Sequence, residues 1–465
     1  MSATDDANAN ASPQGGSTSS SASLGGGMKR TLSLWDLILY GVIVIQPTAP
    51  MSVYGVLSDR GHGHVVTTIL LAMVAMLFTA ISYGRMARAY PSAGSAFTYV
   101  GREINPAFGF VTGWSMVMDY MLNPMICVIW ISSQARNLAP GVPYRAWAVF
   151  FAILITWLNT RGIRSSARIN AALAVAMGVV IAVFFVAAAR YLLGHPHDDA
   201  AFLTRPFYDQ ETWSTKAVLG GTSIAVLTYI GFDGISTLSE EAENPRRNIL
   251  LATVLTCLVI GVLSAFEVYA AQLVWPASTP FPDIDTAFVH VAGRAWGPLF
   301  AVVGFTLLIA NFGSGMGSQL GAARLLYGMG RSSALPKSFF GVLHPKRRVP
   351  QNSVLFVGAV ALLGAFVIDF GLGAEMLNFG ALIAFMGVNA AAFLRYYVRA
   401  PEKKLTNLVP PVLGFCICLL LWLNLSVPAK IAGSAWMAVG IAFGAWKTRG
   451  FRGELVDFEL PPEEA

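Results

Sequence analysis

Long apolar runs alternate with short polar segments along almost the whole chain. A membrane-spanning helix needs about 20 mostly apolar residues, and about twelve runs of that kind follow one another here. The expected spans are residues 34–57, 65–89, 107–138, 144–160, 168–193, 215–238, 249–275, 294–328, 351–369, 375–398, 407–426 and 430–447. The pattern therefore predicts an all-α integral membrane protein with about twelve transmembrane helices.

The first 27 residues have a different pattern, because they are small and polar with no apolar core. Such a segment buries too little surface to fold and lacks the apolar centre of a signal peptide. We expect residues 1–27 to form a disordered cytoplasmic tail. Met28, followed by two basic residues, resembles a second possible start of translation.

Composition supports the membrane assignment. The chain is 55% hydrophobic and 12% charged, with a mean hydropathy of +0.60, whereas soluble domains carry about 25% charged residues. The net charge of +6 arises from basic residues in the loops, with roughly 23 at one set of helix ends and roughly 8 at the other. This bias predicts cytoplasmic termini, and it gives the net charge a cause other than nucleic-acid binding.

The first span is interrupted in its middle by Pro47-Thr48-Ala49-Pro50. Each proline removes a backbone donor and clashes with the preceding turn. A broken helix in a membrane leaves polar backbone groups that protein, water or a ligand must satisfy. We interpret the segment as one wall of a substrate site, with a simple proline kink as the alternative.

The sixth span contains a second group of helix breakers, Gly231 and Gly234, on either side of Asp233. Broken helices at corresponding positions of two halves are typical of inverted-repeat transporters, whose substrate site lies near the middle of the membrane. Asp233 is expected either to titrate during gating or to cap the half-helix that follows.

Two further acidic residues lie inside apolar spans, where charge is costly and usually functional. Asp119 is followed by Tyr120 and Asn123, and its carboxylate is suited to pair with a substrate ammonium group or to bond to the backbone of a broken helix. For Glu267 we favour a structural role facing a polar helix neighbour over a buried proton relay.

Other chemistry finds little support in the sequence. Glu240 and Glu241 lie in a mixed-charge segment that is expected to form a gate or a loop ion-pair network. The histidines of His195-Pro-His197 lack further ligands, and the four cysteines lie in apolar runs, so neither a metal site nor a disulfide is expected. No nucleophile–base set, phosphate-binding loop or signalling domain is evident, so we expect no cofactor and neither an enzyme nor a sensor.

Several motifs resemble one known family. The most specific runs from Ile81 to Val100, ISYGRMARAYPSAGSAFTYV, and others are Gly231-Phe-Asp, Arg324-Leu-Leu-Tyr-Gly-Met-Gly-Arg and His344-Pro-Lys-Arg-Arg-Val-Pro. They resemble the amino acid–polyamine–organocation superfamily of transporters. Gly63-His-Val and Asn378-Phe-Gly-Ala-Leu-Ile-Ala-Phe look most like its bacterial putrescine importers.

The resemblance implies a LeuT-like core of five plus five inverted helices over residues 28–400, with spans one and six broken. Residues 401–465 would hold spans eleven and twelve and a cytoplasmic tail. It further implies that spans one, three, six, eight and ten line the path. The substrate-binding residues would then be Pro47, Thr48, Ala49, Pro50, Asp119, Tyr120, Thr228, Tyr229 and Gly231, with Asp233, Glu240 and Glu241 in coupling or gating.

These expectations combine into a secondary active transporter of the bacterial inner membrane. The expected substrate is a small organic cation such as putrescine, imported with a coupling proton or a sodium ion. A permease or exchanger for neutral or cationic amino acids is the alternative, because a broken first helix also offers a site for a carboxylate. The double proline of span one departs from the single proline of the importers. A monomer and a homodimer are both compatible with the sequence.

Overall fold

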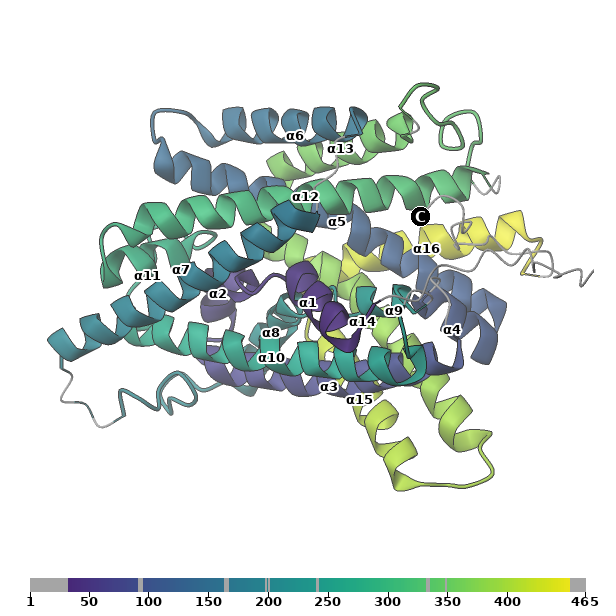
Figure 1. Ribbon diagram of the computed structural model, residues 1–465, viewed down its shortest axis with the longest axis horizontal. Coiled ribbons are helices and arrows are strands. Elements are labelled where there is room, and N and C mark those ends of the chain that lie inside the picture. The colour runs from purple at the N-terminus through teal and green to yellow at the C-terminus, as the bar shows by residue number, and fades with distance from the viewer. Residues whose placement is uncertain are drawn as a thin grey trace, which may run out of the picture.

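The computed structural model describes residues 32–90, 95–162, 167–196, 199, 201–239, 242–331, 335–347 and 349–451. Within these ranges the regular structure is helical, apart from an isolated bridge between Leu32 and Ala242. The long helices lie side by side along the longest dimension of the molecule (Figure 1). The predicted tail of residues 1–27 and the possible start at Met28 lie outside the described residues.

The helices follow one another with short connections. Their bounds are α1 Leu34–Ile45, α2 Ala49–Arg60, α3 Val65–Ala89, α4 Ser95–Glu103, α5 Pro106–Leu138, α6 Tyr144–Thr160, α7 Ala167–Gly194, α8 Thr215–Ala225, η1 Val226–Thr228, α9 Gly234–Thr237, α10 Pro245–Val274, α11 Ala287–Ala295, α12 Leu299–Arg331, α13 Gln351–Val367, α14 Phe370–Phe393, η2 Leu394–Val398, α15 Leu405–Leu423 and α16 Val427–Lys447.

Eight helices among the described residues are long and apolar enough to cross a membrane, and the bent pair α1 and α2 makes a ninth candidate. The protein is therefore a multi-pass membrane protein. Three further predicted spans coincide with α6 and α13, which have 17 residues each, and with the interrupted segment from α8 to α9. The count of twelve spans remains a prediction.

Several span boundaries differ from the sequence prediction by a few residues, and one helix was not predicted. The predicted span 294–328 begins at residue 299 instead, because the short helix α11 ends at Ala295 and Pro298 precedes a new helix. The helix α4, between the second and third spans, was not expected from the apolar pattern, since it is too short and too polar to cross a membrane.

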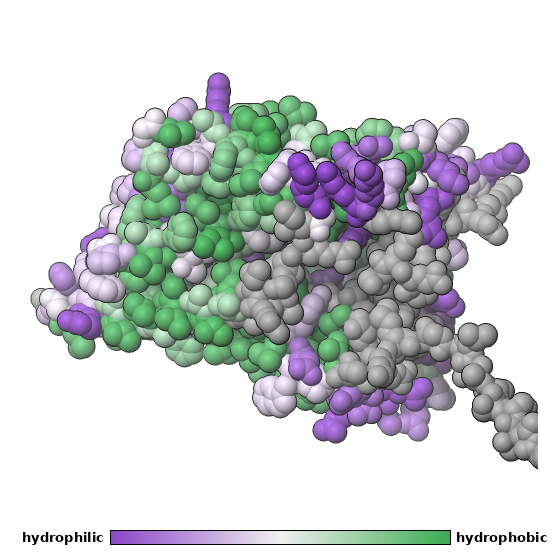
Figure 2. Space-filling view, turned by 45° about the horizontal axis from the view of Figure 1, so that its top comes forward, coloured by the Kyte–Doolittle hydropathy of each residue, from purple (hydrophilic) through white to green (hydrophobic). Residues whose placement is uncertain are grey.

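Hydrophobic side chains cover the middle of the molecular surface, and hydrophilic ones gather toward its ends (Figure 2). Val367 is 84% exposed and Ile431 is 65% exposed. Exposed aliphatic side chains on long helices fit a surface that faces lipid instead of water.

The interior is packed closely around α5. A Cβ atom added at Gly380 of α14 would lie 2.5 Å from the carbonyl oxygen of Ser115 in α5. Small residues of this kind let membrane helices approach one another. Trp130 of α5 is fully buried and donates a hydrogen bond to the carbonyl oxygen of Ser52 in α2, at 3.1 Å. The packing thus places the broken first span against the middle of α5.

Candidate functional site

The predicted break in the first span is confirmed. α1 ends at Ile45, α2 begins at Ala49, and the two helices are bent by 47°. Gln46 has a positive φ of 67°. Proline disfavours helical backbone in the residue before it, so Pro47 explains why the helix stops at this point.

Pro50 has a different role from the one its sequence position suggested. It lies in the first turn of α2, where a missing backbone N–H breaks no helical hydrogen bond. The interruption is therefore confined to Gln46, Pro47 and Thr48, and Pro50 fits the restart of the helix.

The break is held by contacts with other spans. The side-chain amide of Gln46 donates a hydrogen bond to the carbonyl oxygen of Ala310 in α12, at 3.1 Å. The Thr48 hydroxyl contacts the sulfur of Met177 in α7, at 3.2 Å. Thr48 is 1% exposed, so its side chain is directed into the packing around the break.

The sixth span is also broken. After α8 and η1, the chain turns through Gly231, whose φ is +114°, before α9 begins at Gly234. Only glycine adopts that backbone geometry without strain. A Cβ atom at Gly231 would lie 3.0 Å from Cγ1 of Val44 and 3.5 Å from Cγ1 of Ile45. The two breaks therefore lie directly against one another.

Backbone groups near the second break are satisfied by the tenth predicted span. Asn378 of α14 donates a hydrogen bond to the carbonyl oxygen of Ser223 in α8, at 2.7 Å. Inside a membrane an unpaired carbonyl is costly. Asn378 therefore helps α8 to end inside the bundle.

A small cavity of about 90 Å³ lies beside the two breaks. Residues of the broken first span, α5, the sixth span, α12 and the start of α14 surround it. They are Val44, Ile45, Gln46, Ala49, Ser52, Val53, Asn123, Ile126, Cys127, Leu227, Ile230, Asn311, Ser314 and Phe370. Its polar lining is uncharged, and the Asn311 amide donates to the Ser52 hydroxyl at 3.0 Å.

The end of α1 gives this cavity a partial negative charge, because the C-terminus of a helix presents carbonyl groups that attract cations. The N-terminus of α2 offers less to an anion, since Pro50 has no N–H group and the N–H groups of Ala49 and Met51 donate to the carbonyl oxygens of Gln46 and Thr48. The geometry is suited to a small molecule with an ammonium group.

Asp119 and Tyr120 lie next to the cavity but are absent from its lining. Asp119 precedes the lining residue Asn123 by four positions in α5, so the two side chains lie on the same helix face. Asp119 and Asp233 are close enough for their charges to interact, and Tyr120 is close to both. Two carboxylates repel one another when both are ionised, so a cation or a proton stabilises the pair.

Of the other predicted residues, Ala49 lines the cavity and Thr228 and Tyr229 do not. The Thr228 hydroxyl donates to the carbonyl oxygen of Ala225 at 2.7 Å, and the Tyr229 hydroxyl donates to that of Ile69 at 3.0 Å. Their neighbours Leu227 and Ile230 face the cavity instead. The sequence located this segment but not the face that it presents.

Asp233 is the residue immediately before α9, but its side chain makes no capping hydrogen bond to that helix. The expected capping role is therefore not found, and the gating role stays a prediction. Glu240 and Glu241 lie outside the described residues.

Glu267 is a buried carboxyl without a hydrogen-bond partner in the described ranges. It is 0% exposed, and neither carboxylate oxygen has a hydrogen-bond partner among the described residues. The expected structural contact with a polar helix neighbour is therefore not found in the part of the chain that the structure describes.

Sequence reasoning also missed several cavity residues, notably Gln46, Asn123 and Asn311. The signal that was available is a polar side chain inside an apolar span, which is usually functional.

In the described ranges no three His, Cys, Asp or Glu side chains form a group that would hold a metal ion.

Comparison with known proteins agrees with this geometry. Residues 44–450 match the family model for amino acid permeases. The low-affinity putrescine importer PlaP of Escherichia coli K12 is 35% identical over 93% of this chain and 96% of its own length. The branched-chain amino acid permease BcaP of Bacillus subtilis is 25% identical, and the methylthioribose transporter of the same organism 26% identical, each over 89% of this chain and 92% of its own length.

A multi-pass helical bundle with a small cavity beside two broken helices fits a membrane transporter, and the comparisons make it a transporter and not an enzyme. The chain belongs to the amino acid permease family of the amino acid–polyamine–organocation superfamily.

Proposed function

We propose that this transporter imports a small organic cation, putrescine or a related polyamine, across the inner membrane of a bacterium. In this proposal twelve spans cross the membrane, both termini are cytoplasmic, and a proton drives uptake. Spans one to ten form the inverted-repeat core, and the last two lie outside it. The transporter works as a monomer or a homodimer.

The observation that carries the proposal is that Asp119 and Asp233 are close enough for their charges to interact, and that Asp119 lies one helical turn from the cavity residue Asn123. A diamine has two ammonium groups and no carboxylate, so two acidic side chains match its charge. Tyr120 lies near the pair and Tyr40 lies near Tyr120, and aromatic faces attract ammonium groups. The 35% identity to a putrescine importer supports the same substrate class.

The carboxylate pair also offers a means of coupling. Without substrate, a shared proton relieves the repulsion between Asp119 and Asp233. A bound cation relieves the same repulsion, so the carboxylates no longer require the proton. Occupancy of the site by substrate is thereby linked to protonation of the carboxylate pair. Because Gly231 packs on Val44 between the two breaks, a change at one break is transmitted to the other.

An amino acid is the second candidate substrate, and one observation favours it. The polar residues that line the cavity beside the breaks are uncharged, and they include Asn123 and Ser314. Side-chain amides and hydroxyls of this kind donate hydrogen bonds to carboxylates. In this case the end of α1 and the polar lining would hold the zwitterion, and Asp119 would act in coupling.

Uptake of radiolabelled putrescine by the Asp119→Asn variant tests the proposal. We expect uptake to fall to background while the amount of protein in the membrane is unchanged. Asp36→Asn is the control, because Asp36 caps the start of α1, and it is expected to transport normally. Unchanged putrescine kinetics in Asp119→Asn would contradict the role of the carboxylate.

A thermal-shift screen with putrescine and a panel of amino acids separates the two substrates, since a ligand that binds the folded state raises its apparent stability. If an amino acid raised the apparent melting temperature and putrescine did not, the substrate would be an amino acid.

A further inference from the structure

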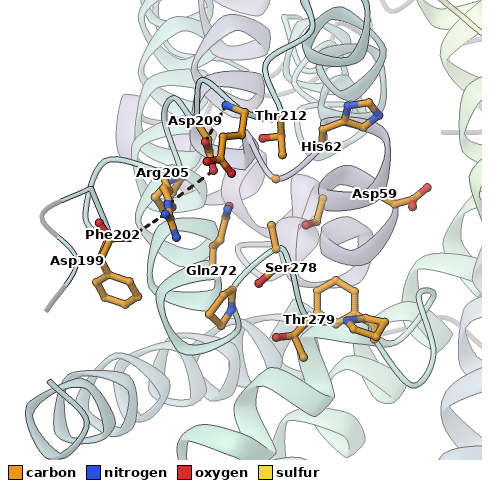
Figure 3. A pocket seen from close by; sticks show the side chains of 18 of the residues that line it. Asp59, His62, Asp199, Phe202, Arg205, Asp209, Thr212, Gln272, Ser278 and Thr279 are labelled. Carbon is orange, nitrogen blue, oxygen red and sulfur yellow. Dashed lines mark hydrogen bonds and ion pairs between the residues drawn. The ribbon is translucent and has the colours of Figure 1, made fainter. Parts of the chain in front are cut away.

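A second, larger pocket lies at the far end of α2 from the helix break. It has a volume of about 680 Å³. Its walls come from the end of α2, the loop between α7 and α8, the end of α10 and the segment before α11 (Figure 3). By the bias of basic residues, this end of the bundle is the outer one.

The charges of this outer pocket are unbalanced. Among its described lining residues are four acids, Asp59, Asp199, Asp209 and Glu211, and one arginine, Arg205. Arg205 is shared between two of the acids, at 2.8 Å from Asp199 and 3.7 Å from Asp209. The excess of carboxylates makes the pocket attractive to cations from the outer solution.

Gln272 of α10 supplies an independent sign of a ligand. The residue is 5% exposed, and its Oε1 atom has no hydrogen-bond partner among the described residues. Its side chain extends toward the middle of the pocket, with Arg205 and Asp209 on one side and Ser278 and Thr279 on the other (Figure 3). A rotation of the terminal amide by 180° exchanges the positions of Oε1 and Nε2. Oε1 then accepts a hydrogen bond from an ammonium group in the pocket.

The arrangement does not suit a metal ion. No three His, Cys, Asp or Glu side chains in the described part of the chain form a metal-binding group, so the carboxylates are spread around the pocket. Phe202 and Phe281 add apolar surface between the polar groups. Separated carboxylates with apolar surface between them match ammonium groups joined by a methylene chain.

We propose that this outer pocket binds organic diamines or polyamines at a site separate from the cavity beside the helix breaks. The proposal takes its choice of ligand from the proposed function. α2 connects the two sites, since Ser52 and Val53 line the inner cavity and Ser58 lines the outer pocket. Ser52 and Ser58 are about 9 Å apart along the helix axis, so one bound diamine does not occupy both sites.

Equilibrium binding of radiolabelled putrescine to the purified protein in lipid nanodiscs tests the outer site. The Asp119→Asn substitution disables the inner cavity, so that binding to the outer pocket is measured alone. Glu211→Gln and Gln272→Leu together then remove one carboxylate and the buried amide from the outer pocket. Gln272→Leu removes a buried oxygen atom that has no hydrogen-bond partner among the described residues, so the apolar replacement should preserve folding. Glu402→Gln, in the loop between η2 and α15, is the matched control.

We expect the Asp119→Asn protein to keep one binding site. Adding Glu211→Gln and Gln272→Leu should weaken that residual binding by at least about tenfold, and adding Glu402→Gln should leave it unchanged. Residual binding should also weaken when ionic strength is raised to about 0.15 M. Glu211→Gln alone should give a smaller loss in the same direction.

The outcomes separate this inference from the proposed function. If putrescine uptake depends on Asp119 but Asp119→Asn retains no binding, or binds equally with and without the pocket changes, the outer site is refuted and the proposed function stands. If Asp119→Asn retains binding that the pocket changes remove, yet the wild-type protein transports no putrescine, the outer site stands and the proposed function is refuted.

Discussion

Gly231 of the sixth span lies against Val44 of the first, so closely that a Cβ atom on the glycine would be 3.0 Å from Cγ1 of the valine. The contact joins the two helix breaks at one point. A side chain at this position would have to displace Val44, and the φ of +114° already favours glycine.

Gly231→Ala should therefore separate the breaks. The backbone strain alone costs about 1–3 kcal/mol, and the added methyl group pushes on Val44. We expect uptake to fall by at least about tenfold at equal membrane abundance. Gly234→Ala is the control, because a Cβ atom there meets nothing within 4 Å. Normal uptake by Gly231→Ala would show that the contact between the breaks is dispensable.

Glu267→Gln tests whether the buried carboxyl of α10 has a hidden partner. An unpartnered acid in a membrane interior is most stable in its neutral form, and glutamine has nearly the same shape. We expect the apparent melting temperature to stay within about 2 °C of the wild-type value. Ser264→Ala, which removes another unpartnered buried group on the same helix, is the comparison. If the melting temperature fell by many degrees in Glu267→Gln but not in Ser264→Ala, the carboxyl would have a polar partner after all, as the sequence analysis expected.

Glu103 anchors α4 to the end of the tenth predicted span. It is ion-paired with Arg395 and, at 2.8 Å, with Arg399, and the Tyr90 hydroxyl donates to it at 2.7 Å. The Glu103 side chain is 3% exposed, whereas the two arginines are more open to water. Glu103→Gln should destabilise the protein by about 2 kcal/mol, because charged hydrogen bonds are lost at a buried position.

The measurement is the apparent melting temperature of purified protein in detergent. Glu402→Gln is the control, since the exposed pair of Glu402 with Lys404 should contribute little. Equal melting temperatures for Glu103→Gln and the wild type would mean that this network does not stabilise the fold.

Asp285, in the segment before α11, should make stability depend on pH. Burial, together with the nearby charges of Asp283 and Asp369, raises the pKa of Asp285 from 3.8 to about 6. A group with a raised pKa binds more protons when folded, so its contribution to stability is present at low pH and is lost as pH rises through about 6.

We therefore expect Asp285→Asn to be more stable than the wild type above pH 7 by about 2 °C in apparent melting temperature. The difference should shrink as pH falls below about 6. Melting curves of both proteins across this range provide the measurement. A difference that is constant with pH would show that the carboxyl does not titrate as its surroundings indicate.

Some features followed from local chemistry and were therefore accessible from sequence. Pro47 cannot continue a helix, and Gly231 marks a backbone turn, so both breaks were predicted where they occur. Pro50 shows the limit of the same reasoning, because a proline that breaks the middle of a helix also fits its first turn, and only the register of α2 distinguishes the two cases.

The faces of the helices were not accessible in the same way. Tyr229 was expected to bind substrate, but its hydroxyl is bonded to the carbonyl oxygen of Ile69. Spans that are apolar on every side carry little periodic signal, so the sequence does not say which face meets the cavity. Gln272 was overlooked for a related reason, since its significance depends on a loop that is distant in the sequence.

By itself the sequence determined that this chain lies in a membrane, that its first and sixth spans are broken, and that acidic groups lie inside it. These properties depend on hydrophobicity and on backbone chemistry, which act locally. Tertiary structure alone decided that Gly231 meets Val44, that Asp119 approaches Asp233, and that an acidic pocket forms at the far end of α2. Those relationships depend on how distant segments pack, and no local pattern encodes them.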